Sequence, residues 1–348
     1  MKAVLSMSIS ADLLKWYDQH HRRLPWRANP GEKPTPYYVW ISEIMLQQTT
    51  VPTVIDYFNR FIQKWPSIEH LATASLDDVL HAWQGLGYYS RARNLHKCAQ
   101  FIASDYGGEI PKEEKELIKL PGIGPYTAAA ISAIAYDIPA PVVDGNIERI
   151  LSRLYTLDTP PKQVKNKLTA YMNTLVPKKR PGDFVQSLMD LGSSVCTPNN
   201  PICATCPIQP YCQAHSKNTV NKYPVKPEKK EKPTKHAYVF LLFNNENKVL
   251  LEKRPAKGLL GGMIGFPTSK WSTTEPCIKD LKSSTGKNLA ITQNKIKHTF
   301  THFHLFLTIV IGETKKHQSG LYAHPNEYAE FAIPTLMKKV WKKFKAAE

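Results

Sequence analysis

"LPGIGPYTAAA", residues 120–130, joins the end of one helical pattern to the start of another through a glycine-rich turn. Gly122 and Gly124 permit positive φ values and let another molecule approach the backbone closely. The helix that follows offers free N–H groups and the positive end of its dipole to an anion. The stretch therefore predicts a helix–hairpin–helix, which either grips a phosphate or simply connects two helices.

Two patterns of apolar spacing divide the chain. Helical periods of three and four residues run through 11–20, 37–50, 54–65, 75–86, 90–107, 112–120 and 126–137. Beyond a Lys- and Pro-rich stretch, residues 236–254 predict two strands around an Asn-rich turn, and residues 298–313 predict one strand. We therefore expect a helical domain at 1–215, a linker at 216–235 and a small α+β domain at 236–348.

The positive charge of the chain lies mostly in its last part. The net charge is +17, with 22 Lys+Arg and 19 Asp+Glu in residues 1–215 but 24 and 10 in residues 216–348. Such a balance favours a polyanionic partner, most often nucleic acid, over a plain solubility charge. No run of about 18 apolar residues occurs and the first residues do not resemble a signal peptide, so no membrane contact is expected. By default we expect a cytoplasmic protein, associated with the nucleoid if the source is a bacterium.

Cysteines concentrate in "CTPNNPICATCPIQPYC", residues 196–212, which holds four of the chain's six. They follow the pattern C-x6-C-x2-C-x5-C at Cys196, Cys203, Cys206 and Cys212. In a reducing compartment such a cluster predicts a metal site more than disulfides, and four thiolates suit either zinc or a [4Fe–4S] cluster. Of the other two cysteines, Cys98 is expected in the core and Cys277 has no assigned role.

Two carboxylates stand in different settings. Asp144, in "VVDGNIERIL", falls where a helix should begin, so we expect an N-cap that stays ionised. Glu43 falls within an apolar helical pattern, and is therefore either on the exposed face or desolvated with a raised pKa. One neutral and one ionised carboxyl group is the pair that cleavage of a glycosidic bond requires.

The stretch "WQGLGYYSRARNLH", residues 83–96, places Tyr88 and Tyr89 on a glycine turn ahead of Arg91 and Arg93. An aromatic side chain on a tight turn can wedge into a base stack, and arginines beside it can meet phosphates. The alternative is a pair of core aromatics next to ordinary surface charge.

Together these motifs resemble the helix-hairpin-helix DNA glycosylase superfamily, and within it the MutY-like adenine DNA glycosylases. The resemblance lies in "LPWR", "VWISEIMLQQT", "GLGYYSRARNLHK", "LPGIGPYTA", "VVDGNIERIL", "MDLGSSVC" and the cysteine spacing, and continues through "GLLGGMIGFP" and "HTFTHFHL". It implies a mostly α N-terminal domain of two helical lobes, one with an iron–sulfur loop. A C-terminal α+β domain similar to Nudix (MutT-like) proteins would follow.

The resemblance also implies an activity, the removal of adenine mispaired with 8-oxoguanine or guanine in duplex DNA after the base is flipped out. Glu43 would protonate adenine and later activate water, and Asp144 would stabilise the oxocarbenium ion with or without a short-lived adduct. Tyr126 and Asn146 match positions that assist around the sugar. The adenine pocket would consist of Trp26, Arg27, Leu46 and Gln186. Contacts to the rest of the DNA would come from Gln48, Thr49, Leu86, Tyr88, Gly122 and Gly124. The four clustered cysteines would hold one [4Fe–4S] cluster, and the protein would act as a monomer.

Two positions refine this expectation. Endonuclease III-like relatives carry a lysine where this chain has Tyr126, and because tyrosine cannot form a Schiff base we expect a glycosylase without strong lyase activity. In the C-terminal domain, Phe300, Thr301 and His302 match a Phe-Ser-His loop that reads 8-oxoguanine, and threonine keeps the hydroxyl group.

Two other functional classes compete with this reading. A Nudix hydrolase needs clustered carboxylates for Mg²⁺, yet residues 250–290 hold only Glu252, Glu275 and Asp280, so we expect an inactive Nudix-like domain. A non-catalytic DNA-binding or redox protein would have no need of Glu43 and Asp144 in these settings.

Overall fold

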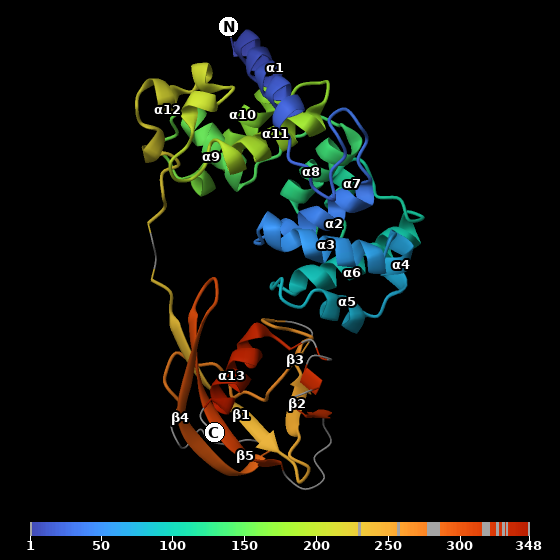
Figure 1. Cartoon of the computed structure of the whole chain (residues 1–348), viewed down its shortest axis with the longest axis vertical. Helices are drawn as coiled ribbons and strands as arrows, with labels where there is room; N and C mark the ends of the chain where they lie inside the picture. Colours follow the sequence, from blue (N-terminus) through green and yellow to red (C-terminus); the bar gives the residue numbers. More distant parts are fainter. Residues whose placement is uncertain are drawn as a thin grey trace. The chain divides into compact units, whose positions relative to one another are not determined.

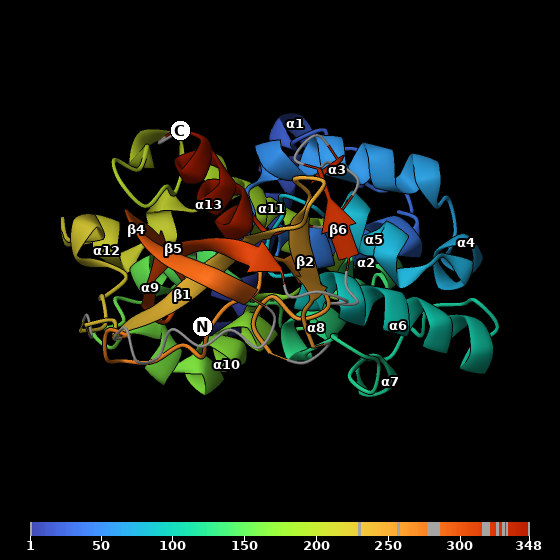
Figure 2. The same ribbon diagram turned by 90° about the horizontal axis from the view of Figure 1, so that it is seen from below.

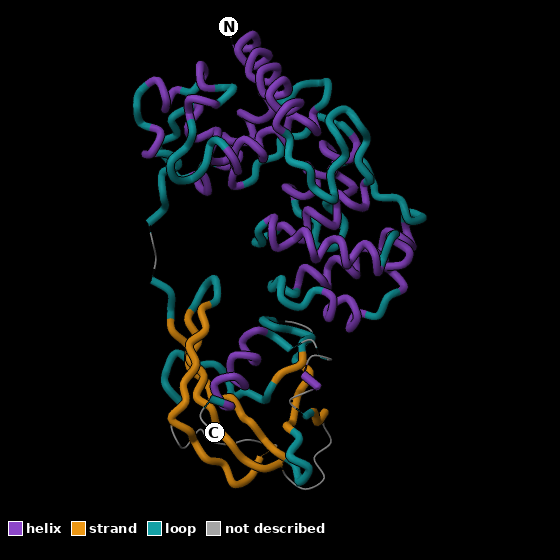
Figure 3. The backbone as a smooth tube through the Cα atoms, viewed as in Figure 1, coloured by secondary structure: helices purple, strands orange, loops and turns teal. Residues whose placement is uncertain are grey.

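The computed structural model describes residues 2–228, 231–255, 258–276, 286–314, 321–324, 327–328, 331 and 333–346. Cys277 and Asp280 lie outside these residues. Contacts divide the chain into a helical unit, Met1–Ala74 with Asn94–Glu228, and a sheet unit, Ser75–Arg93 with Lys229–Glu348. Figure 3 shows the change from helices to strands along the backbone. None of the helices in the described ranges is long and apolar enough to cross a membrane.

The helical unit consists of two groups of helices (Figure 1). One group is α1 (Lys2–His20), α9 (Gly145–Leu154), α10 (Lys165–Leu175), α11 (Pro181–Ser194) and α12 (Gln213–Ser216). The other is α2 (Pro36–Leu46), α3 (Val51–Lys64), α4 (Ile68–Thr73), α6 (Ser90–Asp105), α7 (Glu114–Leu117) and α8 (Pro125–Tyr136). Short 3-10 turns are η1 (Pro161–Gln163), η2 (Cys203–Thr205), η3 (Gln209–Tyr211) and η4 (Val220–Lys222). The predicted pair of helical lobes is thus confirmed.

Helix α8 joins the two groups because it packs on α2 on one side and on α11 on the other. Its residues from Thr127 to Ala135 are all buried, and most are alanine or serine, so neighbouring backbones can approach closely. A Cβ added at Gly182 of α11 would lie 2.6 Å from the carbonyl oxygen of Ala133. This close packing fixes the last turns of α2 and the first turns of α8 and α9 around one space.

Some helices are shorter than their patterns predict. The pattern at 37–50 ends as helix at Leu46, because Gln48 has a φ of +60°. The pattern at 75–86 forms α5 (Leu76–Ala82) and stops before Gly85, whose φ is +105°. Only Glu114–Leu117 is helical within 112–120. In each case backbone in the left-handed region or a tight turn interrupts the helical hydrogen bonds.

The sheet unit is a mixed sheet with helix α13 (Thr335–Lys345) on one face, which confirms the predicted α+β class. Its described strands are β1 (Thr234–Phe243), β2 (Val249–Lys253), β3 (Ile264–Gly265), β4 (Gly286–Thr299), β5 (His304–Thr314) and β6 (Leu321–Ala323). They follow the order β3-β2-β1-β5-β4, with β1 parallel to β5. Strand β6 pairs with β2, beside which it lies in Figure 2. Alternate residues of β1 and β5 pack against the apolar side of α13, as period-2 burial requires.

The single strand predicted over 298–313 is wrong. Strand β4 ends at Thr299, residues 300–303 form a loop, and β5 starts at His304. The N–H of Phe300 donates to the carbonyl oxygen of Phe303 at 2.9 Å, which closes a tight turn between antiparallel strands. The alternating pattern did not reveal this turn, because its residues are as apolar and aromatic as the strands beside it. The domain boundaries at 215 and 235 stay predictions.

Candidate active site

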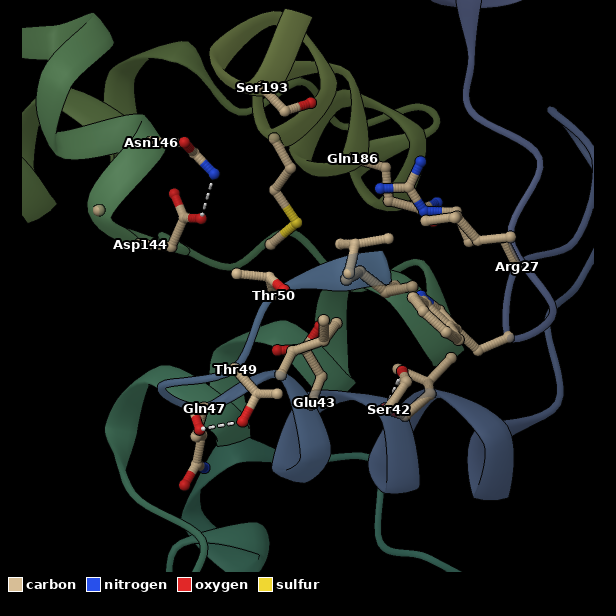
Figure 4. A pocket seen from close by; sticks show the side chains of 18 of the residues that line it. Arg27, Ser42, Glu43, Gln47, Thr49, Thr50, Asp144, Asn146, Gln186 and Ser193 are labelled. Atoms are coloured by element: carbon tan, nitrogen blue, oxygen red, sulfur yellow. Dashed lines mark hydrogen bonds between the residues drawn. The ribbon is translucent and has the colours of Figure 1, made fainter. Parts of the chain in front are cut away.

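A cavity of about 490 Å³ opens in the helical unit between its two groups of helices. Its volume lies within the usual range for small-molecule sites, roughly 300–1,000 Å³. It brings together every predicted catalytic and adenine-pocket residue, and two of the predicted DNA contacts. These are Trp26, Arg27, Glu43, Leu46, Gln48, Thr49, Tyr126, Asp144, Asn146 and Gln186. Figure 4 shows Glu43 on one side of the space and Asp144 with Asn146 on another.

Glu43 is desolvated rather than exposed, because α2 is buried on nearly all sides. The residue is 7% exposed, and the Oη of Tyr126 donates to its Oε2 at 2.9 Å. Burial raises the pKa of Glu43 to about 7, and the Asp144 charge adds to the rise. The Tyr126 hydrogen bond and the charge of Arg27 oppose the rise in pKa. The predicted desolvated form is therefore the one observed, and this carboxyl group can hold a proton near neutral pH.

Asp144 caps α9, as predicted. Its Oδ1 accepts from the N–H of Ile147 at 2.7 Å, and its Oδ2 accepts from the Nδ2 of Asn146 at 3.1 Å. Cap geometry alone does not set its charge, however, because burial raises the pKa of Asp144 and these hydrogen bonds only oppose that rise. The expectation that a capping carboxylate simply stays ionised is thus incomplete.

The neighbours of the two carboxyl groups are held in fixed orientations. Burial raises the pKa of Tyr126 well above its usual value, so its hydroxyl group stays a donor to Glu43. The Nη2 of buried Arg149 donates to the Oδ1 of Asn146 at 2.9 Å, which leaves the Nδ2 of Asn146 to point at Asp144. Arg149 also donates to the carbonyl oxygen of Cys196 at 2.8 Å, so the cysteine loop helps to hold this arginine.

Asp190 is a site residue that the sequence analysis did not single out. It is 1% exposed, and its two oxygens accept from the Nη1 of Arg27 at 2.9 and 2.8 Å. Arg22 donates to the same carboxylate at 2.6 Å. Asp190 therefore fixes Arg27 at the cavity wall, beside Gln186 in Figure 4. An acid inside the apolar helical stretch "MDLG" was the available signal, of the same kind as Glu43.

The hairpin glycines differ from one another. Gly122 has a φ of +80°, and an added Cβ would lie 2.7 Å from the Cβ of Asn94. Gly124 caps α8 with a φ of −94°, so the positive φ expected there is wrong. A Cβ at Gly124 would meet nothing within 4 Å, which shows that the protein leaves this side of the hairpin uncovered.

In the sheet unit, the Tyr88 turn and the loop at 300–303 line one hollow of about 530 Å³. Tyr88 has a φ of +48° and is 47% exposed, and its Oη lies 2.7 Å from the Oγ1 of Thr301. His302 lines the same hollow, whereas Leu86 is buried and does not. Arg91 is also buried and donates to the carbonyl oxygens of Leu86 and Gly87, so it braces the turn and is not a surface charge.

All four clustered cysteines line a second, small hollow in the helical unit. They are free thiols at Cys196, Cys203, Cys206 and Cys212. The Nη1 of Arg153 donates to the Sγ of Cys196 at 3.2 Å. Within the described ranges, no three His, Cys, Asp or Glu side chains converge closely enough to share one metal ion.

Comparisons with known proteins agree with this architecture. A family model described as the HhH-GPD superfamily base excision DNA repair protein matches residues 41–173, and a NUDIX domain model matches residues 238–343. An adenine DNA glycosylase of Buchnera aphidicola from Acyrthosiphon pisum is 35% identical over 345 residues, 96% of this chain and 96% of that relative. The human adenine DNA glycosylase is 33% identical over 405 residues, 97% of this chain and 74% of that relative.

Among solved structures, a thermostable thymine-DNA glycosylase aligns with a TM-score of 0.55 and 28% identity. The alignment covers 61% of this chain and 97% of that one. The helical lobes, the paired carboxyl groups in one cavity and the full-length relatives lead to a single assignment: the chain belongs to the adenine DNA glycosylases, which are helix-hairpin-helix enzymes of base excision repair with a C-terminal Nudix-like domain.

Proposed function

We propose that this chain hydrolyses the N-glycosidic bond of adenine paired with 8-oxoguanine or guanine in duplex DNA, and leaves an abasic site without cutting the strand. One observation carries the proposal. A carboxyl group with a pKa of about 7 and a second, hydrogen-bonded carboxylate face the same 490 Å³ cavity. A cavity of this kind fits a flipped purine nucleoside.

Protonated Glu43 transfers its proton to the adenine ring, so that the base leaves as a neutral molecule. The bond to the sugar breaks and positive charge develops on the sugar ring. Asp144, held by Ile147 and Asn146, stabilises that cation because its oxygens are already fixed in place. Ionised Glu43 then takes a proton from the attacking water.

The residues on the cavity wall support the proposal that the strand is not cut. Strand cleavage through a Schiff base requires an amine, and the described residues that line this cavity include no lysine. Tyr126 occupies the hairpin position next to Glu43, and its hydroxyl group donates to that carboxylate instead. The expected product is therefore an abasic site that alkali is needed to cleave.

Recognition of the opposite base is assigned to the loop at 300–303. The hydroxyl group of Thr301 and the ring of Tyr88 lie at one hollow, so a base read by Thr301 would lie beside the aromatic wedge. Gly122 and Gly124 are assigned to the DNA backbone, and the open space beside Gly124 supports this assignment. Gln48 is assigned to the base stack, and Thr49 and Leu86 are assigned to the side of the damaged base.

Cofactor binding is assigned to the cysteine loop, with one [4Fe–4S] cluster held by Cys196, Cys203, Cys206 and Cys212. Four cysteines that line one hollow provide the four thiolate ligands of such a cluster. Arg153 places a positive charge against one sulfur. When bound, the cluster would brace a loop that has few apolar side chains of its own.

A single-turnover assay on a duplex with adenine opposite 8-oxoguanine tests the proposal, with and without alkali before the gel. We expect a cut strand only after alkali, and a slower reaction opposite guanine. Strand cutting without alkali would contradict the assignment at Tyr126, and no product in either lane would contradict the substrate.

Two variants separate catalysis from binding in that assay. Glu43→Gln should lose adenine removal by several orders of magnitude and still bind the duplex, since the amide cannot donate an acidic proton. Asp56→Asn, an exposed carboxylate on α3, is the matched control and should react as the wild type does. Equal rates of adenine removal for Glu43→Gln and wild type would exclude Glu43 as the acid.

A further inference from the structure

Helix α13 presents a lysine-rich face that the active site does not use. Its buried side consists of Leu336, Met337, Val340 and Phe344, which pack into the core beneath the sheet. Its exposed side consists of Lys338, Lys339, Lys342, Lys343 and Lys345. At about 100° per residue these lysines fall on one half of the helix and the buried residues on the other. We call the five lysines the α13 lysine face.

The charges of this face are not neutralised within the described protein. Helix α13 contains no acidic residue, and no described side chain forms an ion pair with the α13 lysines. Four other lysines of the sheet unit behave differently. Lys248, Lys253, Lys287 and Lys295 each pair with a carboxylate at 2.9–3.2 Å. The α13 lysine face is therefore a concentrated positive charge without a described counter-charge, and it can bind a polyanion.

The position of the face points to one partner. The first turn of α13, Pro334 to Leu336, lines the same hollow as Tyr88 and the loop at 300–303. His298 also lines it, and the charge of Lys339 is the second cause, after burial, that lowers the pKa of His298. A nucleic acid that enters this hollow would thus run its backbone close to the start of the lysine face.

The spacing of the charges fits a phosphate backbone. At 1.5 Å per residue, the distance along the helix from Lys338 to Lys345 is about 10 Å. One strand of duplex DNA carries a phosphate about every 3.4 Å along its axis, so the face spans roughly three phosphates. We propose that the α13 lysine face binds the phosphate backbone of the duplex beside the base that the 300–303 loop reads. This proposal rests on the proposed function, because it takes the bound polyanion to be duplex DNA.

The test compares two full-length variants with equal loss of charge. One carries Lys338→Gln, Lys339→Gln, Lys342→Gln and Lys343→Gln, and leaves Lys345, whose Nζ lies over the ring of Trp341 at 5.6 Å. The control replaces the four paired lysines, Lys248, Lys253, Lys287 and Lys295, with Gln. Fluorescence anisotropy measures the affinity of each for an undamaged duplex over a series of salt concentrations.

If the face contacts two of the phosphates, the slope of log affinity against log salt should fall by about 2 in the α13 variant, and affinity at 0.1 M salt should fall about 50-fold. The control should lose much less. Equal slopes and affinities for the two variants would overturn the proposal and leave an acidic protein as the alternative partner. Adenine removal by the wild type is scored separately, so a failed glycosylase assay beside a clear salt effect would overturn only the proposed function.

Discussion

Replacing Glu43 with Gln should stabilise the helical unit, and the stability gained over the wild type should be larger at high pH than at low pH. Burial raises the pKa of Glu43 from 4.5 to about 7, so the folded protein holds this proton more tightly than the unfolded chain does. The stability that this proton contributes is complete below pH 4.5 and is lost as the pH rises through 7. Over that window the change corresponds to roughly 3 kcal/mol of unfolding free energy.

Gln cannot ionise, so the variant escapes this loss. We expect the unfolding free energy of Glu43→Gln, relative to wild type, to increase by roughly 2–3 kcal/mol between about pH 5 and about pH 8. For a unit of this size that corresponds to a relative gain of about 5–10 °C in Tm. Thermal unfolding followed by circular dichroism at both pH values measures it, with exposed Asp56→Asn on α3 as the control.

The outcome separates a buried carboxyl group from a solvated one. A poorer hydrogen bond from Tyr126 would lower the stability of the variant by about the same amount at both pH values, so it leaves the expected difference unchanged. If the Tm difference between Glu43→Gln and wild type is the same at both pH values, then Glu43 is solvated. The proposed acid would then lack its proton at neutral pH.

Three further perturbations follow from the same geometry. The single-turnover rate should fall as the pH rises through about 7, because Glu43 must be protonated for the first step; a rate that rises through this range would contradict its role as the acid. Gly122→Ala should lower the free energy of unfolding by roughly 1–3 kcal/mol, because Gly122 has a positive φ and the side chain of Asn94 leaves no room for a Cβ. Gly124→Ala should lower it far less, and chemical denaturation of both variants measures the difference. Asp190→Asn leaves Arg27 without its buried counter-charge, so we expect the free energy of unfolding to fall by roughly 3–5 kcal/mol and the KM for the mispair to rise. A stable variant with an unchanged KM would mean that other groups hold Arg27.

Much of the architecture could be predicted from patterns among residues that are close together in the chain. The glycine turn at 122–124, the cysteine spacing and the N-cap at Asp144 depend on residues close together in the chain, and each has a chemical signature that needs no tertiary contact. The change from helical to strand periodicity after 235 likewise follows from adjacent residues. The sequence-based prediction failed at the turn of residues 300–303, because its aromatic residues continue the alternating pattern of the strands on either side.

The chemistry of the site depended on contacts between distant segments. Glu43 and Tyr126 are 83 residues apart, and Arg27 and Asp190 are 163 apart, so no local pattern reports that they meet. Whether Glu43 is exposed or desolvated depended on packing around α2, because the same sequence in an exposed helix would have an ordinary carboxyl group. The sequence thus supplied the residue types and the elements that hold them, while long-range burial set their protonation and orientation, since a pKa responds to everything packed around the group.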